Sequence, residues 1–362
     1  MKKVLFAASN PAHIRNFHRP YIAWLADQGW QVWLLCGGSE PVPGVYRALP
    51  YPFQKRMWSP VNFRTARKLA ALLRQERFDL VYVHTSLAAF FVRLAVRMAG
   101  KGETRVVNMC HGYLFDDQTP PVKRRLLLTA ERLTAPVTDL LLVMNDCDLR
   151  LAEKHRLAAR VVKVDGVGVD FGRFTPRSRT EARRALGVGD GDFLLLYPAE
   201  FSKRKNQPFL LRGLKLLPQN VKLALCGSGA GLSGCQALAA RLGLGGRVLF
   251  PGQVADLSDW YAAADLCVSA SRYEGLPFNI MEGMYAARPI VASQIKGHAD
   301  LVGEGVCGFL YPYGDEDAFA DCVKILMGDQ ELRRIMGEKG RARAETYALD
   351  RVLPQVIDAL AL

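Results

Sequence analysis

Two glutamates eight residues apart, Glu274 and Glu282, are the side chains whose types and spacing best suit a charged, hydroxyl-rich ligand. Glu274 lies in a turn with Gly275 and Pro277, and Glu282 lies on the short helical pattern that follows. The first amides of that helix would bind a phosphate, while the carboxylates accept hydrogen bonds from sugar hydroxyls. The stretch predicts a sugar-nucleotide site, although two glutamates can also reach this spacing by chance on a solvated face.

A basic run, Lys203-Arg204-Lys205, follows the apolar stretch Phe193–Pro198, which we expect to be a strand. Cations at the carboxyl end of a strand can neutralise a diphosphate leaving group as its charge develops. Elsewhere such a run is usually just solvated. Its place directly after a strand favours the functional interpretation.

Two glycine-bearing loops, Gly227-Ser228-Gly229 and Gly37-Gly38-Ser39, also follow expected strands. Glycine lets backbone amides approach a phosphate, but a strand-to-helix turn needs small residues anyway, so each loop alone is a weak signal. The dinucleotide fingerprint G-x-G-x-x-G is absent after the first strand, which leads into Ser9–His13 instead. This difference counts against a nicotinamide enzyme.

Several histidines stand where expected strands of the first half end. His111 follows the apolar run Arg105–Cys110, and a functional and a structural role are about equally plausible for it. His13, His18 and His84 are similarly placed and harder to distinguish.

Two acidic pairs resemble the metal-binding pattern Asp-x-Asp. In Asp146-x-Asp148, however, Asn145 or Asp146 stands where a helix N-cap belongs, and Asp315-x-Asp317 has the same explanation. We therefore expect no required metal.

The composition indicates a globular chain of two domains. Its 362 residues exceed one typical core, and half of them are hydrophobic. No apolar run has the length of a membrane span, and the apolar stretch near the N-terminus is too short for a signal peptide. Eight cysteines without a C-x-x-C pair indicate reduced, buried thiols. A cytoplasmic location is expected.

The positive charge is concentrated in the first half of the chain. The net charge is +13, and residues 1–165 hold 25 Lys/Arg against 13 Asp/Glu. Such asymmetry suggests a nucleic-acid, anionic-membrane or phosphorylated partner. No aromatic-basic recognition motif accompanies the charge, so nucleic acid is not expected. Two segments combine cations with apolar side chains, Lys55–Trp58 and Val122–Leu128, and suggest a peripheral membrane face; a soluble basic surface is the alternative.

Apolar runs alternate with helical patterns along both halves, which predicts parallel sheets covered on both faces. The fold class is α/β, with two Rossmann-like domains facing each other across a cleft. We expect an N-terminal domain over 1–165, a linker over 166–176, a C-terminal domain over 177–345, and a last helix within 346–362 that packs back on the N-terminal domain. Ligands should bind beyond the carboxyl ends of the strands.

Several stretches together resemble the retaining glycosyltransferases of family 4, which have the GT-B fold. The most specific is YEGLPFNIMEGMYAARPIVAS, which carries the E-x7-E pair. The segments GVGVDFGRF, CGSGA and PGQVADLSDWYAAADLCVSAS and the pair His111-Gly112 are also similar. The opening AHIRNFHRPYIAWLADQGWQV is similar to enzymes that build capsular or exopolysaccharide repeat units.

The resemblance implies a role for each matching residue. Glu282 would bind the ribose hydroxyls of the donor, and Glu274 the hydroxyls of the transferred sugar. Arg204 and Lys205 would stabilise the diphosphate, and His111 would contact the donor sugar. The remaining predicted contacts are, for the donor phosphates and nucleotide, Gly227, Ser228, Gly229, Gly275, Leu276, Pro277 and Phe278, and, on the acceptor side, His13, Arg15 and His18.

Two positions depart from the family pattern. Many members have a Gly-Arg pair where this chain has Ala199-Glu200, so Arg204 would supply the missing charge. Many also have a glutamate after a Gly-Gly-x-x turn where this chain has Gly297-His298-Ala299-Asp300. This second departure would alter the donor-sugar contact and the specificity.

The expected activity is transfer of a sugar from a nucleoside-diphosphate donor, with UDP as the expected nucleotide, to a polyprenyl-diphosphate-linked or saccharide acceptor. The resemblance implies retention of configuration, a same-face substitution, no cofactor and a role in surface polysaccharide assembly. A UDP-sugar 2-epimerase and a two-lobed sugar-binding protein are the alternatives.

Overall fold

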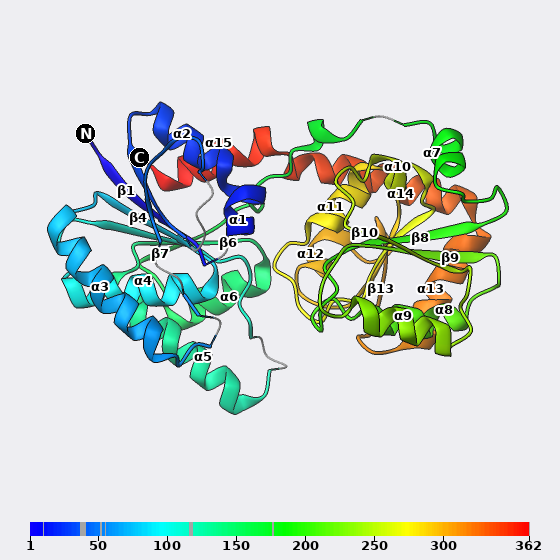
Figure 1. The fold of residues 1–362 in the computed structure, drawn as a ribbon, viewed down its shortest axis with the longest axis horizontal. Helices are drawn as coiled ribbons and strands as arrows, with labels where there is room; N and C mark the ends of the chain where they lie inside the picture. Colours follow the sequence, from blue (N-terminus) through cyan, green and yellow to red (C-terminus); the bar gives the residue numbers. More distant parts are fainter. Residues whose placement is uncertain are drawn as a thin grey trace. The chain divides into compact units, whose positions relative to one another are not determined.

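The computed structural model describes residues 1–9, 11–36, 41–50, 53–54, 56–115, 119–175 and 177–361. It has two compact units, one formed by Met1–Gly168 with Asp350–Leu362 and the other by Val169–Leu349. Each unit is built on one parallel β-sheet with helices on both faces (Figure 1). The predicted α/β fold of two Rossmann-like domains is therefore confirmed.

The first unit has a seven-stranded sheet in the order β3-β2-β1-β4-β5-β6-β7. Figure 1 shows α2 and α15 on one face of this sheet and α3 and α4 on the other. Its strands are β1 Lys3–Ala7, β2 Gln31–Leu35, β3 Val45–Leu49, β4 Leu80–His84, β5 Arg105–Met109, β6 Leu140–Val143 and β7 Arg160–Lys163. Its helices are α1 Pro11–His13, α2 Arg19–Asp27, α3 Pro60–Glu76, α4 Ser86–Ala99, α5 Pro121–Thr134, α6 Asp146–His155 and α15 Leu349–Leu360, with a π-helix at Ile14–His18 and a 3-10 turn at Ala135–Val137.

The second unit has a six-stranded sheet in the order β10-β9-β8-β11-β12-β13. Its strands are β8 Phe193–Pro198, β9 Val221–Cys226, β10 Val248–Gly252, β11 Leu266–Ser269, β12 Ile290–Ser293 and β13 Gly308–Tyr311. Its helices are α7 Arg179–Ala185, α8 Gln207–Lys215, α9 Leu232–Arg241, α10 Ser258–Ala263, α11 Phe278–Tyr285, α12 His298–Val302, α13 Glu316–Gly328 and α14 Gln330–Ala344, with 3-10 turns at Phe171–Arg173 and Glu345–Tyr347.

Burial of the central strands on both faces explains why apolar runs in the sequence predict them. All five residues of β4 are buried, as they must be in a parallel strand with helices on both faces. The edge strand β3 was not predicted, because only Leu49 of its five residues is fully buried and the segment therefore carries no apolar run. The five-residue helix α12 was not predicted either, since its pattern is shorter than two helical turns.

The order of strands reverses once in each sheet, next to β1 in the first unit and next to β8 in the second. From β1 the chain adds strands on one side and then returns to β4, and from β8 it does the same and returns to β11. Loops at the carboxyl ends of two such neighbouring strands diverge and leave room for a ligand. These two positions, β1/β4 and β8/β11, are where the functional residues should gather.

The chain passes from the first unit to the second at Gly168–Val169 and returns at Leu349–Asp350. The Asp165 amide donates to Oε1 of Gln355 on α15 at 2.9 Å, and Arg105 Nη1 donates to the Ala361 carbonyl at 3.0 Å. Helix α15 is thus part of the first unit. Among the described residues, none of the helices is long and apolar enough to cross a membrane.

Candidate functional site

The predicted acidic and basic residues of the second unit meet at the point where its strand order reverses. Glu274 lies on the loop after β11, and Arg204 and Lys205 lie on the loop after the neighbouring strand β8. Arg204 Nη1 is 2.5 Å from Oε2 of Glu274, and Lys205 Nζ is 2.6 Å from Oε1. Residues 70 positions apart in the sequence thus form one charged cluster, because β8 and β11 are hydrogen-bonded neighbours.

The two cations decide the charge state of Glu274. Burial of this carboxyl would by itself raise its pKa, but the nearby charges of Lys205 and Arg204 outweigh burial and lower the pKa from 4.5 to about 2. Glu274 is therefore ionised throughout the neutral range. Both of its oxygens face cations, so Glu274 is suited to fixing the cationic side chains and to accepting hydrogen bonds from hydroxyl groups rather than to donating a proton.

The lowered pKa of Glu274 predicts a stability loss in acid. A carboxyl with a folded-state pKa below its ordinary value stabilises the protein fully above about pH 4.5, and this contribution is lost as the pH falls toward 2. The shift corresponds to about 3 kcal/mol of free energy of unfolding. We expect the stability advantage of the wild type over Glu274→Gln to shrink by about 2 kcal/mol between about pH 6 and about pH 3, because pH 3 is still about one unit above the folded-state pKa.

Hydrogen exchange of peptides from β8 and β11 would measure this prediction for the second unit alone. Glu316→Gln is the control, because Glu316 is a partly exposed partner of Arg212 on the same unit. A difference between the wild type and Glu274→Gln that stays constant across the pH range would contradict the assignment.

A buried polar network holds the basic loop against the acidic one. The hydroxyl of Tyr197 donates to the Lys205 carbonyl at 3.0 Å and lies 2.9 Å from Oγ of Ser271. The Ser293 hydroxyl in turn donates to the Ser271 carbonyl at 2.7 Å. The network joins the ends of β8, β11 and β12, so the position of the cations is fixed by the same groups that fix the loop of Glu274.

His298, at the position where the sequence departs from the family pattern, belongs to this network. Its Nδ1 is 2.8 Å from the Ser293 carbonyl, and its Nε2 is 3.2 Å from Oγ of Ser269. Burial lowers its pKa to about 4, so the imidazole is neutral. The preceding residue, Gly297, has a φ of 81°, and a Cβ there would lie 2.4 Å from the Gly275 carbonyl. The Gly297 turn therefore sets the path of the loop that carries Glu274.

Glu282 is buried on α11 and is held differently from Glu274. Tyr261 donates its hydroxyl to Oε2 at 2.7 Å, and Arg173 forms an ion pair with Oε1. Burial raises the pKa of Glu282, and the charge of Arg173 opposes this only in part. The two glutamates therefore have pKa values shifted in opposite directions, which is common where two carboxyls have different tasks.

Arg173 and Tyr261 were not among the residues predicted from the sequence. Arg173 lies on the 3-10 turn of the segment GVGVDFGRF, and Tyr261 lies on α10. Arg173 is the one cationic residue of the glycine-rich segment GVGVDFGRF, and this was a signal for it. Tyr261 offered none, because its aromatic ring fits the apolar pattern of its helix.

The predicted donor contacts lie in two places, at the start of α11 between the two glutamates and in the Gly227 loop, which packs against Ala199 and Phe201. Helix α11 begins at Phe278 after Pro277, between Glu274 and Glu282, and Leu276 is buried beside it. In the Gly227 loop, the Gly227 amide donates to the Gly252 carbonyl at 2.7 Å, so this amide already has a hydrogen-bond partner within the protein. A Cβ on Gly227 would lie 2.1 Å from the Ala199 carbonyl, and one on Gly229 would lie 2.5 Å from that of Phe201. Close packing of the loops thus explains both glycines.

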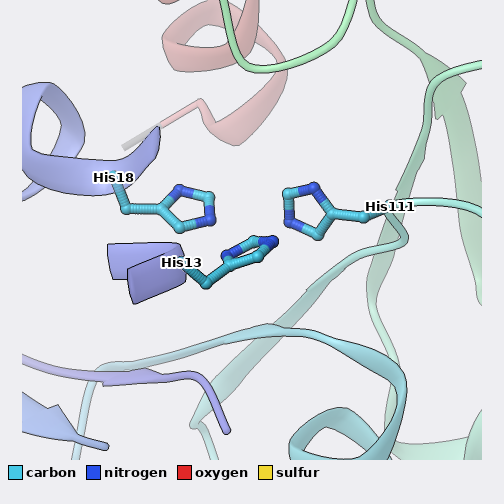
Figure 2. Close-up of side chains that lie close together, drawn as sticks. All are labelled: His13, His18 and His111. Carbon is cyan, nitrogen blue, oxygen red and sulfur yellow. The ribbon is translucent and has the colours of Figure 1, made fainter. Parts of the chain in front are cut away.

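In the first unit, the predicted histidines gather at the β1/β4 position. His13 and His18 follow β1, His84 ends β4, and His111 follows β5. Figure 2 shows the rings of His13, His18 and His111 pointing toward one another. The ring centroids of His18 and His84 are 3.9 Å apart, and His111 Nε2 is 3.4 Å from His84 Nδ1. Sequence reasoning did not predict that the four rings form one cluster.

The histidines are neutral, because burial lowers the pKa of His13 to about 4 and the pKa values of His18, His84 and His111 well below the ordinary range. Thr85, which follows His84, has a φ of 63°. This conformation is strained for a β-branched residue and is found most often near functional sites. Arg15, also predicted on the acceptor side, is exposed on the π-helix.

The capping explanation for the acidic pairs is confirmed. The Asn145 side chain accepts a hydrogen bond from the Asp148 amide at 2.8 Å, and the Asp315 side chain accepts one from the Ala318 amide at 2.9 Å. Asn145 and Asp315 are therefore the N-caps of α6 and α13, and the acidic residues that follow them lie in the first turns of these helices. The predicted loop Gly37-Gly38-Ser39 and Lys55 lie outside the described residues.

Two family models together match most of the chain. "Glycosyltransferase Family 4" matches residues 21–192, and "Glycosyl transferases group 1" matches residues 178–343. With two Rossmann-like domains and this charged site, the class is that of the GT-B glycosyltransferases.

Curated relatives establish the family. The chain is 33% identical over 364 residues to EpsD of Bacillus subtilis, itself provisionally named a glycosyltransferase, with 99% of this chain and 96% of EpsD covered. It belongs to the group 1 and family 4 glycosyltransferases. It is 25% identical over 333 residues to the Escherichia coli UDP-Gal:α-D-GlcNAc-diphosphoundecaprenol α-1,3-galactosyltransferase, with 88% of this chain and 85% of that enzyme covered. Among solved structures, Anabaena HepE in complex with UDP and glucose matches with a TM-score of 0.79 at 20% identity, with 100% of both chains covered.

Proposed function

We propose that this glycosyltransferase moves a hexose from a UDP-sugar to a lipid-linked or saccharide acceptor, with retention of the anomeric configuration, in the assembly of a surface polysaccharide. The observation that carries the proposal is the pairing of Glu274 with Arg204 and Lys205 at the β8/β11 position. Cations at the carboxyl ends of these strands suit a diphosphate, and carboxylates beside them suit sugar hydroxyls. The complex of HepE with UDP and glucose supports a UDP-sugar donor.

The donor binds on the second unit in this proposal. The N-terminus of α11 lies between the two glutamates, and its helix dipole favours a phosphate there. Glu274 accepts hydrogen bonds from the hydroxyl groups of the transferred sugar, and Glu282 accepts hydrogen bonds from those of the ribose. Arg204 and Lys205 neutralise the charge that develops on the diphosphate as it leaves. No metal ion is required for this step, because two protein cations are already in place.

The substitution takes place on one face of the sugar. The bond between the anomeric carbon and the β-phosphate oxygen breaks, and the acceptor oxygen bonds to the same face of that carbon. The acceptor's proton passes to the departing phosphate oxygen, so atoms and charge balance. Both oxygens of Glu274 are held by cations, which makes it a poor nucleophile and favours this path over a covalent glycosyl-enzyme.

The acceptor is a polyprenyl-diphosphate-linked sugar or a saccharide, bound by the first unit. The E. coli relative acts on a diphosphoundecaprenol-linked sugar, which supports a lipid-linked acceptor. The first unit also presents apolar side chains beside cations. Val122 is 84% exposed at the start of α5, next to Lys123, Arg124 and Arg125, and Trp58 is 64% exposed. Such a surface fits the anionic cytoplasmic face of a membrane.

The membrane face predicts binding to anionic vesicles. Replacing Lys123, Arg124 and Arg125 by serine should weaken binding to phosphatidylglycerol vesicles by roughly 100-fold, because each cation near such a surface contributes about 1 kcal/mol. Co-sedimentation measures the change. Serine at Arg334 and Lys339, on α14 of the second unit, is the control. Equal sedimentation of the wild type with anionic and zwitterionic vesicles would contradict the proposal.

A panel of nucleotide-sugars screened by mass spectrometry tests the transfer itself. The expected result is a new glycoside formed from one UDP-sugar, and nuclear magnetic resonance of the product would show the anomeric configuration of the donor. A free epimer of the donor sugar would instead indicate an epimerase. No binding of any nucleotide-sugar in calorimetry would overturn the proposal in favour of a sugar-binding protein.

A further inference from the structure

Three histidines of the first unit, His13, His18 and His111, offer ring nitrogens that all lie within 4.8 Å of one another. Figure 2 shows the three rings converging from the segment after β1 and the segment after β5, with ring nitrogens directed at the space between them. The ring centroids of His13 and His111 are 4.4 Å apart, and those of His13 and His18 are 4.9 Å apart. A divalent zinc ion binds imidazole nitrogens at about 2.0–2.1 Å, so small side-chain rotations would bring all three onto one ion.

The local backbone is built to bring two of these histidines together. His13 and His18 are five residues apart, and in an α-helix such residues point about 140° away from each other. The segment Ile14–His18 is instead a π-helix, whose i→i+5 hydrogen bonds place residues five apart on the same side. π-helical turns are rare and occur most often at functional sites. The π-helix therefore brings the rings of His13 and His18 together.

Two of the three rings, those of His13 and His18, have nitrogens that lack the partners a structural role would provide. His18 is fully buried, and neither of its ring nitrogens has a hydrogen-bond partner among the described residues; the same holds for Nδ1 of His13. A buried polar atom without a partner costs about 1–3 kcal/mol. A histidine cluster that served packing alone would have these nitrogens hydrogen-bonded, whereas a metal ion would bind one nitrogen of each ring.

We propose that His13, His18 and His111 form a binding site for a divalent transition metal of the zinc type. Three imidazoles are a donor set that suits zinc and its neighbours rather than magnesium or calcium, which prefer oxygen. Three protein ligands leave a fourth position for water or for an oxygen of an anionic ligand. His13 and His111 are only partly buried, so that position is reached from their side. His84 lies behind them and contacts His18 and His111.

This inference does not rest on the proposed transfer reaction. The transfer step proposed above still needs no metal, but His111 would bind a metal ion instead of making the contact with the donor sugar that the resemblance implies. The sequence could not suggest the site, because the spacing of His13 and His18 excludes a common face on an α-helix and His111 is almost one hundred residues away.

Metal analysis of the purified full-length protein tests the site. After removal of metals with a chelator, titration with zinc alone should give one tight site per chain, and cobalt alone should give the visible absorption of a four-coordinate ion. His13→Gln and His111→Gln should each weaken zinc binding by roughly 100-fold or more, since loss of even an outer partner costs 10–100-fold. His155→Gln is the matched control, because His155 is the last residue of α6 and does not belong to the histidine cluster.

Thermal unfolding gives a second readout. Zinc should raise the Tm of the wild type and of His155→Gln but not of His13→Gln or His111→Gln. Circular dichroism verifies that these two variants are folded. The test does not use a substitution of the fully buried His18, because that variant could fail to fold. No tight zinc site in the wild type, or equal binding by all variants, would overturn the proposal. Binding of inorganic phosphate without zinc, lost in the same variants, would overturn it in favour of an anion site.

Discussion

Replacing Lys205 by alanine is expected to lower kcat by roughly 10²- to 10³-fold, with a smaller change in the KM for the donor. Lys205 Nζ is 2.6 Å from Oε1 of Glu274, and in the proposed reaction it neutralises the charge that develops on the leaving diphosphate. Its charge is therefore most valuable in the transition state, and its removal costs turnover more than binding. Steady-state kinetics with varied donor would measure both constants.

Lys222→Ala is the matched control for Lys205→Ala. Lys222 also forms an ion pair in the second unit, with Asp192 at 2.7 Å, but away from the β8/β11 position. This variant should keep its kcat within a few-fold of the wild type. If Lys205→Ala raised KM and left kcat unchanged, Lys205 would serve ground-state binding and the assigned role would be wrong.

Replacing Glu282 by alanine is expected to raise the KM for the donor by roughly 10- to 100-fold and to change kcat little. A charge-assisted hydrogen bond to a ligand hydroxyl contributes about 1.5–3 kcal/mol, which corresponds to this range. Because Glu282 is assigned to the ribose, its loss should weaken the binding of UDP itself. Glu274→Gln should weaken the binding of the UDP-sugar more than that of UDP, since Glu274 is assigned to the sugar and reaches the diphosphate only through Arg204 and Lys205.

Calorimetry with UDP and with the UDP-sugar separates the two glutamates. Tyr261→Phe is an informative companion, because it removes only the hydroxyl that donates to Glu282 and keeps the ring. It should weaken UDP binding less than Glu282→Ala does. Equal losses for UDP and UDP-sugar in both glutamate variants would show that the carboxylates act together through the loop rather than on separate halves of the donor.

The sequence predicts the strands and the charged residues of the second unit for a simple physical reason. A central parallel strand is buried on both faces, so β8 and β11 appear as continuous apolar runs, and the residues after them are the ones that can reach a ligand. Glu274, Arg204 and Lys205 could be chosen from that rule. Their pairing could not, because it depends on which strands are neighbours, and the sequence does not state the strand order.

Other features depended on contacts that no local pattern reports. Tyr261 and Arg173 reach Glu282 from a helix and a turn that are distant in the chain. The exposed strand β3 carries no apolar run, and the π-helix at Ile14–His18 depends on backbone hydrogen bonding that side-chain periodicity does not reveal. The histidine cluster was missed for the same reason.

Helix α15 has a consequence for the order in which the chain can fold. Val352, Val356 and Leu360 are buried in the first unit, although the whole second unit precedes them in the sequence. During synthesis the first unit therefore stays incomplete until α15 has been made, which happens only after the whole second unit has been made. The half of the protein that is made first is the half that is completed last.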